Sequence, residues 1–346
     1  MGDPRSYRAS RTEAVSRASD RGCVSPAVRT MTESNKASEH HPSCSVIMPT
    51  FRGGTYLEEA ARSVLTQTLE DLELIVVDDG CPENSSSRVA RLGDPRVVIH
   101  RQENLGATRA RNAGLGLARG RAVLFLDADD RLRPDALQRL SAALDARPLA
   151  TVAYGRAARM DADGHVSGLW QRPLTSREPS GNVLRVLLRH NFIRCPGAAL
   201  VRASCFQRTQ GFNPAAYPGA DWELWCRLAR LGPFVNIAGG PVVDYRAHPS
   251  SMTLRVAEHP LVAMRAVALV FNNPELVGNM SPARLSRLYR RREASVHAWL
   301  ATECMRAGDL ARARDLFKMS LARRPWSPRV VILLLFALAR TRPFWF

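Results

Sequence analysis

The sequence predicts an α/β fold with a mostly parallel central sheet and helices on both of its faces. Between residues 45 and 127, four short segments are apolar almost throughout, and segments of amphipathic helical period separate them. Strands that are apolar on both sides are typical of parallel sheets covered by helices on each face. Polar residues follow these segments directly, at the sheet edge where such folds bind their ligands. These observations together indicate the fold class.

The predicted strands and helices alternate through the first half of the chain. Serines 85–87 offer N-cap side chains for one helix, Gly120 ends another, and Pro134 lies near the start of a fourth. The predicted strands are residues 45–50, 72–80, 96–100 and 122–127, and the predicted helices are 56–68, 85–93, 106–120 and 133–148. Such alternation is expected when each strand is joined to the next parallel strand by a crossover helix.

The pattern is looser after residue 150. From residue 255 onward the period is largely helical, and we see no cluster of residues suited to catalysis there. Between these points we predict a strand at 151–155, a turn at 161–165, a helix at 181–192, a strand and then a helix within 197–206, a helix at 220–232 and a strand followed by a loop at 240–253.

Composition limits the class of protein. The formal charge is +17, and Lys36 and Lys318 are the only lysines, so nearly all the positive charge is arginine. The arginines are spread along the chain without a basic run, so we expect anionic substrates or membrane lipid rather than nucleic acid as partners. Seven cysteines without a Cys-x-x-Cys pair indicate reduced thiols. No apolar run reaches the ~20 residues of a membrane span, and none resembles a signal peptide, which predicts a cytoplasmic location.

The stretch FLDADDRLRP places Asp127, Asp129 and Asp130 directly after the fourth predicted strand. Carboxylates so close together raise one another's pKa and repel, unless a cation or hydrogen-bond donors separate them. One interpretation is a solvated turn in which one aspartate caps the next helix, and the other is a divalent metal site. Polar residues also follow the first two predicted strands, at 49–50 and 78–79. All three strand ends should open onto one rim of the sheet, which favours the metal site.

Six motifs follow one another along the chain: SVIMPTFRGG, LELIVVDDG, ENLGATRARNAGLGLARG, LFLDADD, DWELWCRL and YRAHPSS. Together they resemble a family 2 glycosyltransferase with the GT-A nucleotide-sugar-binding fold, from about Ser45 to about Thr253. The resemblance implies a metal-dependent, inverting transfer of a sugar from a nucleoside diphosphate donor to a hydroxyl group. Mg²⁺ or Mn²⁺ is the implied cofactor, and a UDP-sugar is the implied donor.

The resemblance implies that the ends of the first two strands bind the nucleotide. Pro49, at the end of the first strand, is expected among the substrate-binding residues. Phe51 is expected to stack on the base or line its pocket, and a core aromatic is the alternative. Asp79 is expected to accept a hydrogen bond from the base's ring N–H, with Asp78 supporting the site or capping the loop. A place near the nucleotide and the sheet rim is also implied for two residues of the third helix, Arg111 and Asn112, although a solvated arginine is the alternative.

The resemblance also assigns the acidic stretch to metal and donor binding. Asp127 is expected to face the ribose or a metal-bound water, and Asp129 to ligate the cation that bridges the diphosphate. Asp130 would complete the shell or cap the next helix. His248 matches a histidine that relatives bring back towards the metal or the diphosphate. Mg²⁺ and Mn²⁺ prefer hard oxygen ligands, and the cation supplies the positive charge that neighbouring carboxylates lack.

The acceptor side is implied by the DWELWCRL segment. Asp221 matches the family's general base, which takes the proton from the acceptor hydroxyl, and a helix N-cap is the alternative. The family often has a second acid just before this position, where this chain has Ala220. Trp222 and Glu223 are expected near the acceptor, or else in packing and at the surface.

We divide the chain into three parts. Residues 1–43 lack an apolar period and predict a disordered arm. Residues 44–255 form the GT-A domain, with a nucleotide-binding half at 44–150 and an acceptor-binding half at 151–255. Residues 256–346 form a helical C-terminal extension.

The extension carries two further features. Residues 295–328 resemble one tetratricopeptide-like helix pair, which should pack against the domain or a partner because one repeat is too few to stand alone. Residues 330–346 combine a short apolar run with arginines and terminal aromatics. Such a segment suits the interface of a membrane, which would make the protein peripheral to the inner face of the cell membrane, and a packed docking helix is the alternative.

The sequence therefore predicts a glycosyltransferase that acts in glycan, polysaccharide or glycolipid synthesis. Two rival functions are a nucleotidyltransferase, which would share the sheet, and a non-catalytic interaction protein with a glycosyltransferase-like fold. A nucleotidyltransferase would release pyrophosphate rather than a nucleoside diphosphate. The presence of Asp127, Asp129, Asp221 and His248 argues against the non-catalytic protein.

Overall fold

The structure is a computed structural model that describes residues 41–169, 178–248, 251–339 and 341. The predicted arm at 1–43 lies outside these residues except for its last three, and part of the predicted tail at 330–346 lies outside them as well.

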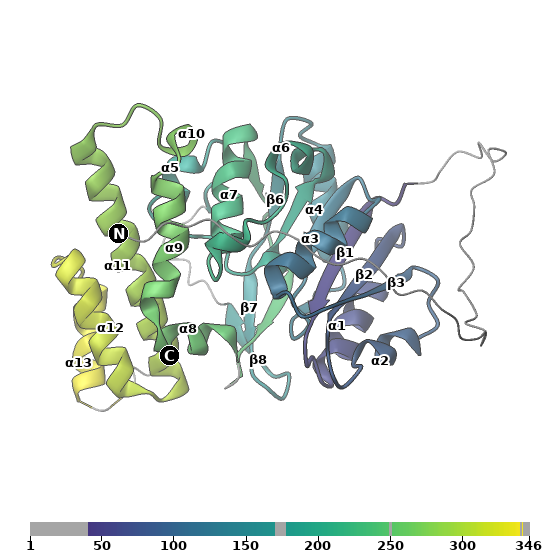
Figure 1. Cartoon of the computed structure of the whole chain (residues 1–346), viewed down its shortest axis with the longest axis horizontal. Helices are drawn as coiled ribbons and strands as arrows, with labels where there is room; N and C mark the ends of the chain where they lie inside the picture. The colour runs from purple at the N-terminus through teal and green to yellow at the C-terminus, as the bar shows by residue number, and fades with distance from the viewer. Residues whose placement is uncertain (1–40, 170–177, 249–250, 340, 342–346) are drawn as a thin grey trace, which may run out of the picture. The chain divides into compact units, whose positions relative to one another are not determined.

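A seven-stranded sheet forms the centre of the fold (Figure 1). Its strand order is β10-β6-β9-β4-β1-β2-β3, and neighbouring strands are parallel except where β9 pairs with β4 and β6. The strands are β1 (Cys44–Thr50), β2 (Leu72–Asp79), β3 (Val97–Gln102), β4 (Ala122–Phe125), β6 (Val152–Tyr154), β9 (Ala199–Arg202) and β10 (Phe234–Asn236). The mostly parallel sheet confirms the predicted fold class.

The strand order brings the predicted strand ends together. β1 pairs in parallel with β2 on one side and with β4 on the other, so the C-terminal ends of all three lie along one edge. The turn after β2 depends on Gly80, whose φ of +73° suits glycine and whose Cβ would lie 2.8 Å from the backbone nitrogen of Asn104. The predicted common rim is therefore present.

Helices flank the main sheet (Figure 1). α3 packs closely on β1 and β2, and Gly114 permits this, because a Cβ there would lie 2.4 Å from Ile47 Cγ2. α4 packs on β6 and β9. The helices of this half are α1 (Tyr56–Leu65), α2 (Ser86–Ala90), α3 (Ala107–Leu117) and α4 (Ala136–Asp145).

A second, four-stranded sheet was not predicted. Its order is β5-β11-β7-β8, formed by β5 (Arg131–Leu132), β11 (Val243–Arg246), β7 (Ala157–Met160) and β8 (Val166–Leu169). The predicted turn at 161–165 joins β7 to β8. Because β11 pairs with β5, the segment before His248 lies beside the acidic stretch that precedes Arg131.

The second half of the domain also contains α5 (Leu184–Leu187), α6 (Phe206–Thr209) and α7 (Ala220–Leu231). The prediction of a helix over 181–192 is wrong in extent. Gly181 has a φ of +82° and forms a β-bridge with Phe234, so the chain enters the helix only at Leu184.

The C-terminal region is helical, as predicted, and consists of α8 (Met252–Glu258), α9 (Pro260–Phe271), α10 (Pro274–Val277), α11 (Pro282–Ala307), α12 (Leu310–Arg323) and α13 (Pro328–Leu338). α11 and α12 form the predicted helix pair, joined through Gly308 in the left-handed conformation, and α13 packs on α12. Within the described residues, none of the helices combines the length and apolarity that a membrane crossing requires.

Candidate active site

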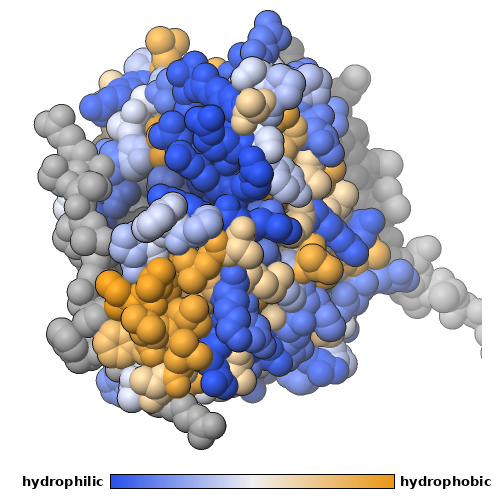
Figure 2. Space-filling model, turned by 90° about the vertical axis from the view of Figure 1, so that its left-hand side faces the viewer, coloured by the Kyte–Doolittle hydropathy of each residue, from blue (hydrophilic) through white to orange (hydrophobic). Residues whose placement is uncertain are grey.

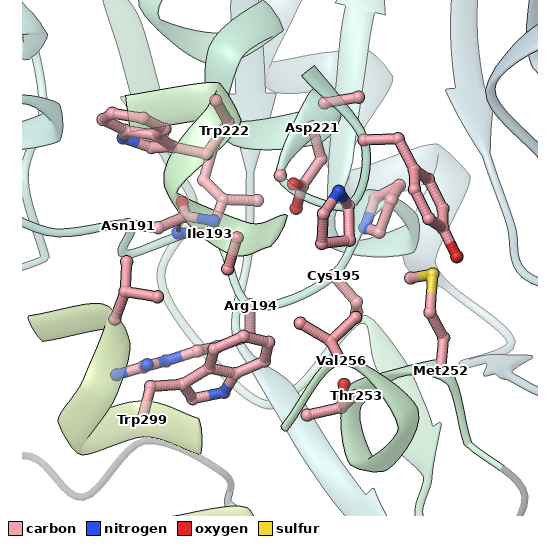
Figure 3. Close-up of a pocket in the computed structure, with 18 of the residues that line it drawn as sticks. Asn191, Ile193, Arg194, Cys195, Asp221, Trp222, Met252, Thr253, Val256 and Trp299 are labelled. Carbon is pink, nitrogen blue, oxygen red and sulfur yellow. Dashed lines mark hydrogen bonds between the residues drawn. The ribbon is translucent and has the colours of Figure 1, made fainter. Parts of the chain in front are cut away.

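A cavity of about 200 Å³ opens at the C-terminal edge of the main sheet. Residues of α3 and of the acidic loop after β4 line the cavity on the sheet side. The start of α7 contributes Asp221 and Trp222 (Figure 3). Among the predicted site residues, those that line this cavity are Arg111, Asp127, Asp129, Asp221 and Trp222. The structure therefore gathers residues that are 110 positions apart in the sequence into one site.

The three aspartates of the acidic loop have three different partners. Asp127 forms an ion pair with Arg111 of α3. Asp129 Oδ2 lies 2.8 Å from His248 Nε2. Asp130 is buried beneath the loop and accepts a hydrogen bond of 2.9 Å from the backbone N–H of Arg246. The loop is thus held by contacts from two other parts of the chain.

Asp129 and His248 form the part of the site that is suited to a cation. The Asp129 side chain is 35% exposed and that of His248 is 14% exposed, so both can reach a ligand at the rim. A carboxylate oxygen and an imidazole nitrogen at this spacing fit a divalent cation that also takes oxygens from a diphosphate. Nearby, the buried Oδ2 of Asp130 has no hydrogen-bond partner among the described residues.

A different trio has the closest metal-ligand spacing among the described residues. Donor atoms of Asp161, Asp163 and His165 lie within 4.8 Å of one another in the exposed turn between β7 and β8. Asp161 Oδ1 accepts hydrogen bonds from the backbone N–H groups of Asp163 and His165, which is the geometry of an acidic turn. The sequence predicted only a turn here.

The nucleotide side of the rim carries Phe51 and Asp79. Phe51 follows the buried end of β1 and is 46% exposed, so its ring is free to contact a ligand. Asp79 Oδ1 accepts hydrogen bonds from Gln102 Nε2 and from the N–H of Leu105, and Oδ2 accepts one from the N–H of Gly106. These three hydrogen bonds use three of the about four acceptor positions of a carboxylate, and Asp79 is 3% exposed.

Comparison with known proteins assigns this arrangement to a family. Residues 45–209 match the family described as glycosyl transferase family 2. Residues 45–209 of this chain therefore belong to the family 2 glycosyltransferases. The solved structures below share the fold of this chain.

Relatives support the assignment at moderate identity. The glycosyltransferase is 27% identical to chondroitin synthase of Escherichia coli over 199 residues, which cover 57% of this chain and 28% of the synthase. It is 28% identical to hyaluronan synthase of Pasteurella multocida over 200 residues, or 57% of this chain and 20% of that one. An uncharacterized glycosyltransferase of Haemophilus influenzae is 26% identical over 233 residues, or 64% and 70% of the two chains. The match thus spans only a fifth to somewhat over a quarter of the two synthases.

Solved structures share the fold. Residues 1–349 of Staphylococcus aureus TarS, in complex with UDP-GlcNAc, superpose with a TM-score of 0.56 at 15% identity, covering 86% of this chain and 88% of that one. The mannosyltransferase PcManGT of Pyrobaculum calidifontis, in complex with GDP-Man and Mn²⁺, gives a TM-score of 0.53 at 19% identity, covering 87% and 81%. At this level of identity the likeness describes the fold.

The electrostatics of the glycosyltransferase site single out Asp221. Of the three carboxylates that line the cavity, Asp127 and Asp129 have close cationic or imidazole partners, whereas Asp221 has no ion pair in the described part of the chain. Burial raises the pKa of Asp221, while a hydrogen bond from the Trp222 backbone and the charges of Arg111 and Arg292 partly oppose the rise. Asp221 is therefore the carboxylate best able to take up a proton.

Several predicted residues lie outside the cavity lining. Asp78 is fully buried and accepts hydrogen bonds from the N–H of Cys81 (2.8 Å) and from Ser86 Oγ (2.6 Å), so it orders the turn instead of contacting a ligand. Pro49 is likewise buried within β1. These two residues shape the rim from below.

Asn112 and Glu223 serve internal contacts. Asn112 makes two hydrogen bonds of 2.8 Å to the backbone N–H and C=O of Phe212, which join α3 to the segment after α6. Glu223 is 5% exposed and forms a bidentate pair with Arg227, whose guanidinium also donates to the backbone C=O groups before α7. Glu223 does not line the cavity, and its carboxylate is committed to this pair, which favours the alternative that it serves packing.

Sequence reasoning missed Arg246, which fixes the geometry of the site. Arg246 is 2% exposed and donates to the backbone C=O of Asp129 (2.8 Å) and to Glu59 Oε2 (2.6 Å). Its guanidinium also lies 4.3 Å from the centre of the Tyr56 ring. The residue belongs to the YRAHPSS motif, and the arginine two positions before the candidate ligand His248 was the available signal.

Proposed function

We propose that the protein transfers a sugar from a nucleoside diphosphate donor, most simply a UDP-sugar, to a hydroxyl acceptor with inversion and with the help of a divalent cation. The observation that carries this proposal is the shared cavity of Asp129 and Asp221. It combines a cation-binding rim with a second carboxylate that has no ion-pair partner among the described residues. Retention through a covalent intermediate would need a further nucleophilic carboxylate, and the other two in the cavity are engaged.

The donor's nucleotide would lie over the ends of β1 and β2. The exposed ring of Phe51 supports stacking on the base, and the fourth acceptor position of Asp79 would recognise a ring N–H. Thr108 and Arg111 also line the cavity. The Oγ1 atom of Thr108 and the Nε atom of Arg111 are buried, and neither has a hydrogen-bond partner among the described residues. Buried polar atoms without partners are costly unless a ligand or water satisfies them.

Asp129 and His248 would hold Mg²⁺ or Mn²⁺. A bound cation would neutralise charge on the leaving diphosphate as the sugar–phosphate bond breaks. Arg111 orients Asp127 at the edge of this position, and Arg246 holds the backbone of the loop. The complex of PcManGT with GDP-Man and Mn²⁺ supports the choice of cation class.

Asp221 would act as the general base. It opens α7 and its carboxylate points into the cavity (Figure 3). The raised pKa makes it a stronger base than an ordinary aspartate, while Arg111 and Arg292 keep the carboxylate form accessible. It would accept the proton of the acceptor hydroxyl as that oxygen attacks the sugar.

The acceptor is proposed to be a glycan, polysaccharide precursor or glycolipid. The similarity to a chondroitin synthase and a hyaluronan synthase supports a saccharide acceptor. A donor screen tests the proposal: nucleoside diphosphate release is measured with each nucleotide sugar, with Mn²⁺ or Mg²⁺ and with a chelator. Release of a nucleoside diphosphate that depends on the cation is expected, and release of pyrophosphate would indicate a nucleotidyltransferase instead.

We also propose that α13 contacts an anionic membrane surface. Figure 2 shows a continuous apolar area on the side of the molecule where the C-terminal helices lie. The exposed apolar residues of α13 are Val331, Ile332, Leu335 and Leu338, and Trp326 just before the helix is 90% exposed. Arg323, Arg324 and Arg329 flank them in the sequence. Aromatic and apolar groups beside arginines suit the interface of an anionic bilayer.

A further inference from the structure

One wall of the cavity comes from α11, which lies in the C-terminal extension rather than in the matched segment at 45–209. The residues of α11 that line the cavity are Arg292, Ser295, Val296 and Trp299. Their spacing of three, four and seven positions places them on one face of the helix. The sequence indicated no cluster suited to catalysis after residue 255, and the structure adds that this face of α11 lines the cavity.

Arg292 is a buried cation without a charged partner. Its side chain is 8% exposed, and no ion pair or hydrogen bond joins it to the described residues, so Nε has no acceptor. Its guanidinium lies 3.9 Å from the centre of the Trp222 ring, which is a favourable contact but does not satisfy the donors. Burial lowers the pKa of Arg292 to about 10, with Cys226 and Asp221 opposing, so the group stays charged at neutral pH.

A buried charge without a partner destabilises the fold, because the protein does not replace the hydration that the charge has lost. Such a charge is therefore expected mainly where a ligand pairs with it. The other charged groups of the cavity do not complete Arg292. Asp127 is paired with Arg111, Asp129 is paired with His248, and Asp221 acts on Arg292 only at a distance greater than an ion pair. The α11 side of the cavity is therefore left electropositive.

A second arginine lies in the same region. Arg194 lines the cavity and has no ion pair or hydrogen bond within the described part of the chain. Arg194 is exposed, so its guanidinium can reach a ligand in the cavity. Figure 3 shows Arg194 beside Trp299, across the cavity from Asp221.

This wall also offers a platform for a sugar ring. Trp299 is 38% exposed at the cavity, and Trp222 forms the opposite side with its indole N–H donated to the backbone C=O of Leu187. Aromatic faces with a nearby polar group are well suited to the apolar face of a saccharide. Guanidinium groups add bidentate recognition of a carboxylate or phosphate.

We propose that Arg292 and Arg194 form an anion subsite for a negatively charged group, a carboxylate or a phosphate, carried by the acceptor saccharide. Trp299 packs against a ring of the same acceptor, whose hydroxyl faces Asp221. The assignment to the acceptor follows from position. α11, which carries Arg292, lies on the opposite side of the molecule from β1 and β2, whose C-terminal ends carry Phe51 and Asp79 (Figure 1). The proposal rests on the proposed glycosyl transfer for its acceptor.

A binding experiment without catalysis tests the subsite. The thermal transition of the full-length protein is followed with glucuronate, glucose 6-phosphate or uncharged glucose, for the wild type, Arg292→Met and Arg291→Met. Arg291 is the matched control, because it is the next residue of α11 and is exposed. At least one anionic probe should raise the wild-type and Arg291→Met midpoints, glucose should not, and Arg292→Met should lose the shift.

The ligand-free proteins separate binding from structure. Met has a similar length and no charge, so Arg292→Met should unfold at the wild-type temperature or above it. A large drop in the ligand-free midpoint together with an unchanged probe shift would overturn the proposal and make Arg292 a packing residue. Equal shifts with glucose and glucuronate would overturn it as well.

A transfer experiment separates the acceptor from the donor. With an active donor in hand, kcat/KM is compared for one saccharide that ends in glucuronic acid, the same saccharide with a 6-phosphate, and the same saccharide ending in glucose. Arg292→Met should reduce kcat/KM for a charged acceptor by about 10- to 100-fold, the range of a charge-assisted hydrogen bond, and leave UDP affinity unchanged. If Arg292→Met instead reduced kcat/KM when UDP-glucuronic acid is the donor, and not when UDP-glucose is the donor, the subsite would belong to the donor sugar. Absence of turnover with every donor would contradict the proposed transfer. The changes in thermal midpoint with the anionic probes would still test the subsite in that case.

Discussion

Replacement of Asp221 by Asn removes the proposed base while preserving the shape of the side chain. Asn keeps one oxygen that can accept the hydrogen bond from the Trp222 backbone at the start of α7. A positioned general base commonly contributes about 10²–10⁴ in rate, which corresponds to roughly 3–5 kcal/mol of activation free energy. No other carboxylate that lines the cavity is without a close partner, so we expect a loss towards the upper part of this range.

The pH dependence gives this prediction a second readout. Because the folded protein raises the pKa of Asp221, the wild-type rate should fall with decreasing pH at a higher pH than an ordinary aspartate would give. A raised carboxyl pKa contributes stability below the unfolded pKa, and that contribution is lost as the pH rises through the folded value. At neutral pH the ionised Asp221 therefore destabilises the fold, and Asp221→Asn should unfold at the same temperature as wild type or a higher one.

The assay compares the rate of transfer, the affinity for UDP with cation, and the thermal midpoint. Asp315→Asn serves as control, because Asp315 is exposed on α12, far in sequence from the site. We expect Asp221→Asn to lose turnover, keep UDP affinity and keep its midpoint. An Asn variant with near wild-type turnover would refute the base assignment and reduce Asp221 to a helix-start residue.

Three further predictions concern the rest of the chain. UDP is titrated with and without Mn²⁺. The cation should raise the UDP affinity of the wild type by about 10-fold or more, and Asp129→Ala should lose this increase. A wild type whose affinity does not rise with Mn²⁺ would contradict the metal assignment. Ile332→Glu combined with Leu335→Glu should release the protein from anionic liposomes in a sedimentation assay without changing UDP affinity, and a lower thermal midpoint would instead show that this face packs on the protein. Asn112→Ala should cost about 1–3 kcal/mol of unfolding free energy in urea, because both backbone groups of Phe212 lose their partner, and a wild-type urea midpoint would show that water replaces the amide.

The nucleotide half of the fold was predictable because its signals are local. Each of the four predicted strands there is a short apolar run, and three of them end in the polar residues of the rim. The strands β5, β7, β8 and β10 were not predictable in the same way. They have two to four residues each and, unlike β4, do not continue into a longer apolar run. Runs that short have no measurable period, and their pairing depends on distant partners.

The α11 wall of the cavity shows a different limit. The face that carries Arg292 and Trp299 has an ordinary helical period, so the sequence reveals a helix with an apolar stripe and nothing more. What makes Arg292 notable is that the fold buries it against Trp222 without an acid. Burial and missing partners are properties of the tertiary structure, and a pattern of residue types does not contain them.

The crowding of three aspartates after β4 is explained by three separate partners rather than by one shared cation. Asp127 is balanced by Arg111, Asp130 accepts from the Arg246 backbone, and only Asp129 with His248 projects to the rim in a form suited to a metal. Burial, with the charges of Asp129 and Asp127, raises the pKa of Asp130 well above its ordinary value, which favours a neutral carboxyl beneath the loop. The three carboxylates of the acidic stretch therefore have different roles. Asp127 joins α3 to the loop, Asp130 supports the loop from inside, and Asp129 remains available for the proposed cation.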